Sequence, residues 1–207
     1  MNTVAIIAID LGKLSFHVHA QDDRGHELYH RRFNRESLIR HLANLAPCTV
    51  AMEACGGSHF MAREVTRLGH TPKLIPAQFV RPYVKSNKND FADAAAIGEA
   101  ATRDQMRFVH PKTEAQQALA MLNSLRDSFI KDRTATMNRI HAYLLEVGVS
   151  LAPTFKAVRE LPILLDDSTF SPLIKKLLLD LHAHFSYLDD RIKALDKEVH
   201  SQAVSDD

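Results

Sequence analysis

The sequence has little of several features that define common classes of protein. Its only two cysteines, Cys48 and Cys55, make no disulfide framework and suit a reducing compartment. It contains no apolar run of membrane-spanning length, and it does not open on a charged, apolar and small-residue signal sequence. We therefore expect a cytoplasmic protein with no membrane partner.

The chain also lacks an excess of charge of either sign. Its 26 basic and 25 acidic residues leave a formal net charge of +1, so composition neither requires nor excludes a polyanionic partner. Any basic surface has to be local. With 207 residues and 45% hydrophobic content, the chain is long enough for one sizeable domain, or for a compact domain with an appendage.

Short apolar runs separated by turns fill the first hundred residues. Val4–Asp10 has the composition of a strand buried on both faces, Leu14–Ala20 alternates as a half-buried strand does, and His26–Phe33 follows a turn. These runs predict an antiparallel meander of three strands. Further elements then alternate between helix and strand: 38–45, 49–52, 59–68, 72–75 and a helix over 89–103.

Long helices are predicted for the rest of the chain. No glycine or proline interrupts Thr113–Val147, and apolar residues repeat with heptad spacing over Leu181–Val199. Gly148–Pro172 separates them as a connector with at most short helices. Helices of roughly 30 residues reach about 45 Å, so we expect them to pack as an antiparallel pair, on a partner chain, or both. We therefore divide the chain into a domain over 1–110 and a coiled-coil region over 111–207.

Four carboxylates are predicted to gather at one place. Asp10 and Glu53 end buried strands, while Asp90 and Asp93 fall in the first turn of a helix. Taken singly, each also fits a structural turn or a helix N-terminus. Together they repel, by some 4 kcal/mol per pair at about 4 Å, so raised pKa values or a divalent cation must relieve them. All-oxygen ligands favour Mg²⁺ or Mn²⁺, and one or two such ions would suit displacement at phosphorus.

Basic residues interleaved with aromatic ones precede the acidic helix. They predict phosphate contacts beside the metal site, with a solvated basic loop as the alternative. The candidate nucleic-acid-binding residues are Lys13, Lys73, Arg81, Lys85 and Lys88. Arginines on the long helix, among them Arg126 and Arg133, fit either a second nucleic-acid contact or an ordinary solvated face. His17 and His19 share one side of the second strand, and we interpret them as surface residues.

Three segments carry a resemblance to a known family. Ile9-Asp10-Leu11-Gly12-Lys13, Met52-Glu53-Ala54-Cys55-Gly56-Gly57 and Lys88-Asn89-Asp90-Phe91-Ala92-Asp93-Ala94 resemble motifs of the DEDD transposases of the IS110 family, including its IS1111 branch. The third is the most specific, because that family carries Lys-x-Asp-x-x-Asp-Ala here. The resemblance covers roughly residues 4–103 by motif.

The resemblance implies both a fold and an activity. It implies an RNase H-like (RuvC-like) mixed sheet with flanking helices, followed by a coiled coil. It also implies a DNA transposase or recombinase that uses Mg²⁺ (or Mn²⁺), works as a dimer or tetramer, and is guided by a bridge-type RNA. The catalytic and metal-binding residues would be Asp10, Glu53, Asp90 and Asp93. Family members continue into a domain with a nucleophilic serine, which we expect this 207-residue chain to lack, leaving it unable to recombine DNA alone.

Other functions stay open at this point. Actin-like and sugar-kinase ATPases also begin with a buried strand, an aspartate and a glycine-containing turn, although no second glycine-rich phosphate hairpin is found. A Holliday-junction resolvase of the RuvC type would share the carboxylates without needing such long helices. A catalytically idle fragment that binds nucleic acid or oligomerises is the remaining alternative.

Overall fold

The structure is a computed structural model that describes residues 3–84, 90–166 and 168–205. The chain divides into two compact units, Met1–Glu114 and Ala115–Asp207. The first, here called the sheet unit, contains every described strand, and the second, the helical unit, is formed by helices. Within the described ranges, no helix is both long and apolar enough to cross a membrane.

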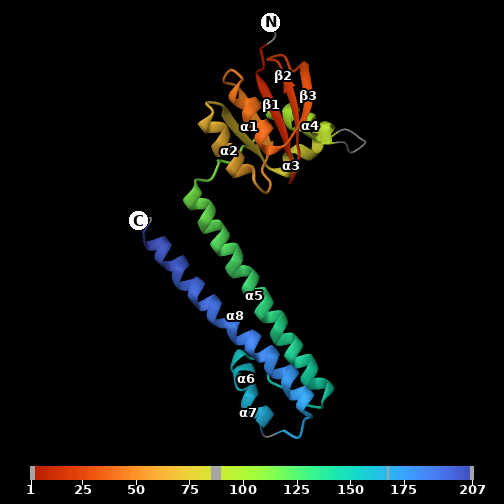
Figure 1. Ribbon diagram of the computed structural model, residues 1–207, viewed down its shortest axis with the longest axis vertical. Helices are drawn as coiled ribbons and strands as arrows, with labels where there is room; N and C mark the ends of the chain where they lie inside the picture. The colour runs from red at the N-terminus through yellow and green to blue at the C-terminus, as the bar shows by residue number, and fades with distance from the viewer. Residues whose placement is uncertain (1–2, 85–89, 167, 206–207) are drawn as a thin grey trace. The chain divides into compact units, whose positions relative to one another are not determined.

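Five strands form one mixed sheet in the sheet unit (Figure 1). They are β1 (Ile6–Leu11), β2 (Phe16–Gln21), β3 (Glu27–Phe33), β4 (Thr49–Glu53) and β5 (Thr71–Ile75). Their spatial order is β3-β2-β1-β4-β5. The first three pair antiparallel, which confirms the predicted meander, whereas β4 pairs parallel with both β1 and β5. This is the predicted RNase H-like α/β fold.

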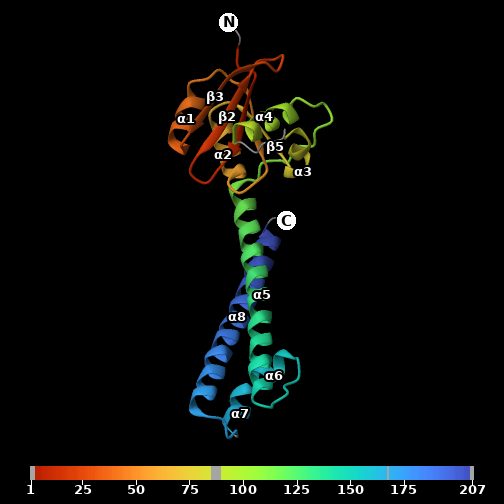
Figure 2. The ribbon, with the colours of Figure 1, turned by 90° about the vertical axis from the view of Figure 1, so that its right-hand side faces the viewer.

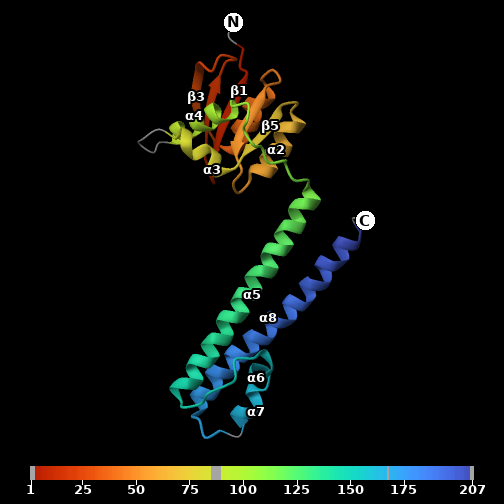
Figure 3. The same cartoon turned by 180° about the vertical axis from the view of Figure 1, so that it is seen from behind.

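Helices cover both faces of this sheet. On one face, α1 (Arg35–Ala43) and α2 (Ser58–Arg67) pack over the core that contains Ile7 and Ile9 of β1. On the other face, α4 (Asp90–Ala101) packs over Ala8. Figure 3 shows this helix and the sheet from behind. Between β5 and α4 the chain forms the short α3 (Ala77–Val80) and the 3-10 turn η1 (Arg81–Tyr83).

A glycine lets α4 approach the sheet closely. A Cβ at Gly98 would lie 3.1 Å from Gln21 Oε1, 3.3 Å from Ala8 Cβ and 3.5 Å from His19 Cδ2. The first two distances are tighter than ordinary van der Waals contact, so a larger residue here would require neighbouring atoms to shift by a few tenths of an ångström. The Gln21 amide also donates to the Gly98 carbonyl oxygen at 3.5 Å. The close packing brings the first turn of α4 to the sheet.

The helical unit is built on two long helices that run side by side in opposite directions (Figure 2). Its elements are α5 (Glu114–Glu146), α6 (Phe155–Arg159), α7 (Leu161–Asp166) and α8 (Pro172–Ser205). Arg126 of α5 pairs with Asp196 of α8, and Arg133 pairs with Asp189. Seven positions forward along α5 therefore correspond to seven positions back along α8. The predicted antiparallel pairing therefore occurs within the chain.

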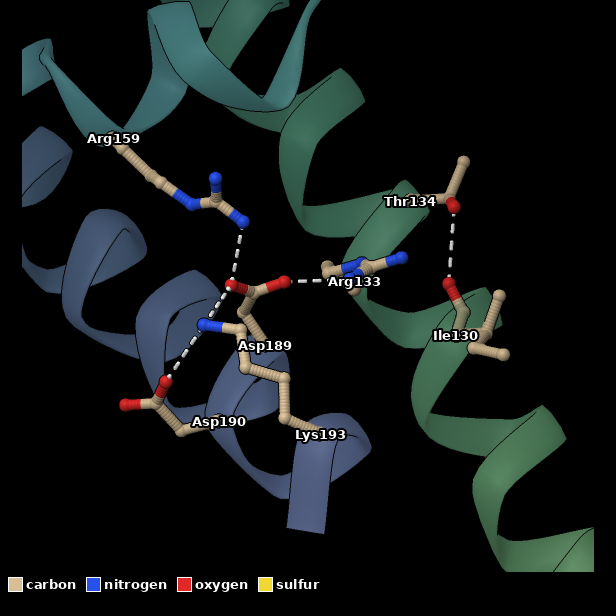
Figure 4. Close-up of polar contacts among 7 residues, drawn as sticks. All are labelled: Ile130, Arg133, Thr134, Arg159, Asp189, Asp190 and Lys193. Atoms are coloured by element: carbon tan, nitrogen blue, oxygen red, sulfur yellow. Dashed lines mark hydrogen bonds and ion pairs between the residues drawn. The ribbon is translucent and has the colours of Figure 1, made fainter. Parts of the chain in front are cut away.

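An ion network lies between these helices (Figure 4). Asp189 is 4% exposed and accepts from Arg133 at 2.6 Å, from Arg159 at 2.8 Å and from Lys193 at 2.9 Å. Burial by itself would raise the pKa of Asp189, but hydrogen bonds from these three cations outweigh it and lower the pKa to about 2. Arg126 and Arg133 therefore face α8 and make internal ion pairs.

Candidate metal centre

Asp10 lies near the end of β1, on the side of the sheet that α4 covers. Side chains alternate along a strand, so Asp10 shares its side with Ala8. The chain then turns tightly, and Gly12 fits this turn because a Cβ there would clash with the carbonyl oxygen of Ser15. The turn directs β2 back along β1 and places His17 directly opposite Asp10.

The other predicted carboxylates lie on the same side of the sheet. Glu53 ends β4, which runs parallel to β1, so the two strands end at one edge. Glu53 shares its side of β4 with Ala51, which packs against α4. Asp90 and Asp93 lie in the first turn of α4, three positions apart and therefore on one helix face. Strand ends and a helix terminus thus direct four carboxylates to one side.

A histidine joins two of these carboxylates in the tightest part of the site. Asp10, His17 and Asp90 each offer a possible ligand atom within 4.8 Å of the others. His17 Nδ1 lies 3.6 Å from Asp90 Oδ2. Within the part of the chain that the structure describes, Glu53 and Asp93 do not belong to such a group. The sequence analysis proposed all four acids as metal-binding residues but did not propose the histidine.

The pKa of Asp10 responds to all three of the other carboxylates, including the two that lie outside the group of close ligand atoms. The pKa of Asp10 is raised, first by burial and then by the negative charges of Asp93 and Asp90; Glu53 adds a smaller effect, and His17 acts in the opposite direction. Among the described residues, no lysine or arginine forms an ion pair with any of the four. The negative charge at this site is therefore not balanced by a basic side chain of the described residues.

The interpretation of His17 and His19 as surface residues is wrong. Each is 8% exposed, because α4 covers the side of β2 on which they lie. His19 Nδ1 is 3.3 Å from Glu27 Oε2, and burial lowers the pKa of His19. Alternation along β2 identified the two sides of the strand, but it could not reveal that a helix 70 positions later covers the polar one.

Comparison with known proteins assigns the chain to a family. A family model for DEDD transposases of the IS110 type, described as a transposase, matches residues 7–149. The chain belongs to this transposase family. It is 45% identical to the transposase for insertion sequence element IS1328 of Yersinia enterocolitica, over 100% of this chain and 62% of that protein.

Two further relatives agree. The chain is 37% identical to the transposase for insertion sequence element IS1111A of Coxiella burnetii, over 100% of this chain and 58% of the relative. It is 36% identical to a probable family 20 transposase of Pseudomonas aeruginosa, over 97% of this chain and 60% of the relative. This member of the family thus spans about 60% of the length of these relatives. The predicted resemblance is confirmed.

The described basic residues that were predicted to bind nucleic acid lie in separate parts of the sheet unit. Lys13 is exposed in the turn after β1, and Arg81 is exposed at the start of η1. Lys73 Nζ lies 4.7 Å from the centre of the Phe108 ring. Lys85 and Lys88 lie outside the described residues. No basic cluster beside the metal centre is established by these positions, and the nucleic-acid contact remains a prediction.

The residues present fit a divalent ion. Asp10 and Asp90 supply carboxylate oxygens, which Mg²⁺ and Mn²⁺ both accept, and His17 supplies an imidazole nitrogen, which Mn²⁺ accepts more readily. Burial, and then the negative charges of Asp93 and Asp90, raise the pKa of Asp10 and oppose its ionisation. A bound cation would favour the ionised form of each carboxylate.

Proposed function

We propose that this chain is the metal-binding part of a DNA transposase, in which Asp10, Glu53, Asp90 and Asp93 hold Mg²⁺ or Mn²⁺ against a phosphodiester group. The observation that carries the proposal is the gathering of these carboxylates on one side of an RNase H-like sheet, where burial and then the negative charges of Asp93 and Asp90 raise the pKa of Asp10. Membership of the transposase family supports DNA as the substrate.

The protein side chains have distinct roles in this proposal. Asp10 is fixed by the sheet, and Asp90 is presented by the first turn of α4, with its side chain 66% exposed. A half-buried and an exposed ligand together would anchor the ion while leaving one side open to DNA. The bound ion would supply charge stabilisation at a phosphoryl oxygen and orient the attacking group. Lys13, Lys73 and Arg81 would contact neighbouring phosphates.

The proposed partners are DNA, a bridge-type guide RNA and further copies of the chain. The RNA is proposed from the resemblance to the IS110 family. Oligomerisation as a dimer or tetramer is supported by large apolar side chains exposed on the long helices, including Met121 at 64%, Leu173 at 65% and Tyr187 at 55%. These exposed side chains offer apolar area to a partner helix.

We further propose that residues 1–207 do not exchange DNA strands by themselves. The family resemblance implies a serine nucleophile in a further domain, and the relatives are longer than the region that this chain covers. The metal centre alone would bind DNA without completing recombination. Strand exchange by the isolated 207-residue chain would contradict this part of the proposal.

A binding experiment tests the proposed function. Fluorescence anisotropy would measure the affinity of the chain for a branched DNA with EDTA and with Mn²⁺, for the wild type and for Asp10→Asn. We expect Mn²⁺ to strengthen wild-type binding about tenfold and to have little effect on the variant, because Asp10 would help to hold an ion whose positive charge attracts phosphate. Equal Mn²⁺ effects on both proteins, or tight ATP binding without DNA binding, would overturn the proposal.

A further inference from the structure

His17 occupies a position in the candidate metal centre that the four carboxylates do not explain. Its side chain is 10% exposed, and its Nδ1 atom lies 3.6 Å from Asp90 Oδ2. Two ligands held about 2.1 Å from one ion are roughly 3.0 Å apart when adjacent and about 4.2 Å apart when opposite. The observed separation lies between these values, so both side chains reach a common ion after small adjustments.

We infer that His17 is a nitrogen ligand of the divalent ion held by Asp10 and Asp90, and that it favours Mn²⁺ over Mg²⁺. This inference rests on the proposed function and adds a ligand to it. Mg²⁺ prefers oxygen ligands, whereas affinity for first-row transition ions rises when imidazole is present. The centre would thus be a mixed nitrogen and oxygen site.

The surroundings of His17 hold its ring in place. The pairing of β1 with β2 places its backbone opposite Asp10, and Phe91 of α4 meets its ring edge to face, with ring centres 4.8 Å apart. Phe91 also contacts His30, at 4.9 Å between ring centres. Since Phe91 is the next residue after Asp90, one turn of α4 presents a carboxylate ligand and orients the imidazole.

The contact between His17 and Asp90 is long for a purely structural ion pair. A charge-assisted hydrogen bond between nitrogen and carboxylate spans about 2.7–2.9 Å, and the 3.6 Å observed here exceeds that range. The groups that face His17 include the carboxylates Asp10 and Asp90, the rings of Phe91 and, beyond it, His30, and Arg32, which is its register partner on β3. Arg32 forms no ion pair with either acid among the described residues, so both carboxylates remain available to a cation.

Pulsed electron paramagnetic resonance of bound Mn²⁺ tests the inference directly. A directly bound imidazole nitrogen modulates the electron spin echo of Mn²⁺, whereas carboxylate oxygens do not. We expect this nitrogen signal in the intact chain, its loss in His17→Ala, and its retention in His26→Ala. His26 is the matched control, because its side chain is 70% exposed and pairs with Asp22 in the turn after β2.

Calorimetry measures the predicted ion preference. We expect His17→Ala to lower Mn²⁺ affinity about tenfold or more and Mg²⁺ affinity less than about threefold. His17→Gln keeps most of the side-chain volume and replaces nitrogen with an amide oxygen, so it should restore Mg²⁺ binding more than Mn²⁺ binding. Equal losses for the two ions in folded His17→Ala would overturn the inferred preference.

The outcomes separate this inference from the proposed function. Mn²⁺ that binds the wild type in an Asp10-dependent manner, but without a nitrogen signal, would overturn the role of His17 and leave the carboxylate site intact. Mn²⁺ binding that is unchanged in Asp10→Asn would overturn the proposed metal centre itself. The wild-type spectrum requires no variant, so misfolding of His17→Ala would not prevent a decision.

Discussion

Each of the two units of this chain contains an aspartate at a packed interface, and the pKa values of these two aspartates are shifted in opposite directions. Asp189 in the helical unit is surrounded by Arg133, Arg159 and Lys193, and its pKa falls to about 2. Asp10 in the sheet unit is partly buried and lies near other carboxylates, and both effects raise its pKa. Basic side chains of the helical unit pair with the carboxylate of Asp189, whereas no described lysine or arginine forms an ion pair with Asp10.

This contrast supports a structural role for Asp189 and the proposed metal-binding role for Asp10. A buried acid that is fully paired stabilises a fold, and removing one partner leaves an uncompensated charge. Acidic side chains that lie close together without basic partners destabilise the metal-free fold. Residues whose pKa values are perturbed in this way cluster at functional sites. Asp10 and Asp189 therefore serve as matched probes in the following experiments.

The largest effect is expected from breaking the Asp189 network. Asp189→Asn leaves Arg133, whose side chain is 15% exposed, without its carboxylate and should destabilise the helical unit by about 3 kcal/mol. Urea denaturation with hydrogen exchange resolved along α5 and α8 measures it. Asp190→Asn is the control, since Asp190 is 78% exposed and contacts Lys193 alone among the described ion pairs. Similar losses in both variants would contradict the structural role of Asp189.

Acid should remove the same stabilisation. The pKa of Asp189 is lowered in the fold from an ordinary 3.8 to about 2, so its contribution is fully present above the ordinary value and is lost as pH falls through about 2. The shift corresponds to about 2 kcal/mol, and to about 1 if solvent screens the half-exposed Arg159 and Lys193.

The stability difference between wild type and Asp189→Asn isolates this effect from other titrating groups. When urea midpoints are compared between pH 6 and pH 2, it should stay nearly constant down to about pH 4 and then shrink as the pH falls further. A difference that stays constant over this range would mean that the network does not depend on the ionised carboxylate.

A smaller effect is expected from substituting basic residues that are proposed to contact DNA. Arg126, Arg133 and Arg159 make internal ion pairs, whereas Arg81 makes none among the described residues. Arg81→Ala combined with Lys85→Ala should weaken DNA binding and reduce the salt slope of log affinity by about 0.9 for each lost phosphate contact. Arg40→Ala with Arg67→Ala on the opposite face is the control. An unchanged slope would exclude the predicted basic segment.

The smallest expected effect concerns the metal-free sheet unit. Because the pKa of Asp10 is raised in the fold, its ionised form costs stability at neutral pH, and this cost appears as pH rises through the folded pKa. Asp10→Asn should therefore raise the melting temperature slightly in EDTA at pH 7, with no gain below pH 3.8. A lower melting temperature for Asp10→Asn in EDTA would show that Asp10 stabilises the sheet unit as Asp189 stabilises the helical unit.

Much of the fold could be predicted because local patterns agree with it. Buried runs ended by carboxylates placed β1 and β4, and heptad spacing predicted the packing stripe of α8. His17 was missed because its place depends on strand register, although a turn at Gly12 already pairs positions 10 and 17. Two of the partners of Asp189, Arg133 and Arg159, are 56 and 30 positions away, and only the packing of α5, α6 and α8 reveals them.

The most direct test of the central claim is calorimetric titration of Mn²⁺ into the wild type, Asp10→Asn and Asp189→Asn at a temperature where all three are folded. We expect Asp10→Asn to lose at least about tenfold in Mn²⁺ affinity, because it removes a ligand of the unbalanced site. Asp189→Asn should bind like the wild type. Equal Mn²⁺ binding by wild type and Asp10→Asn would contradict the account.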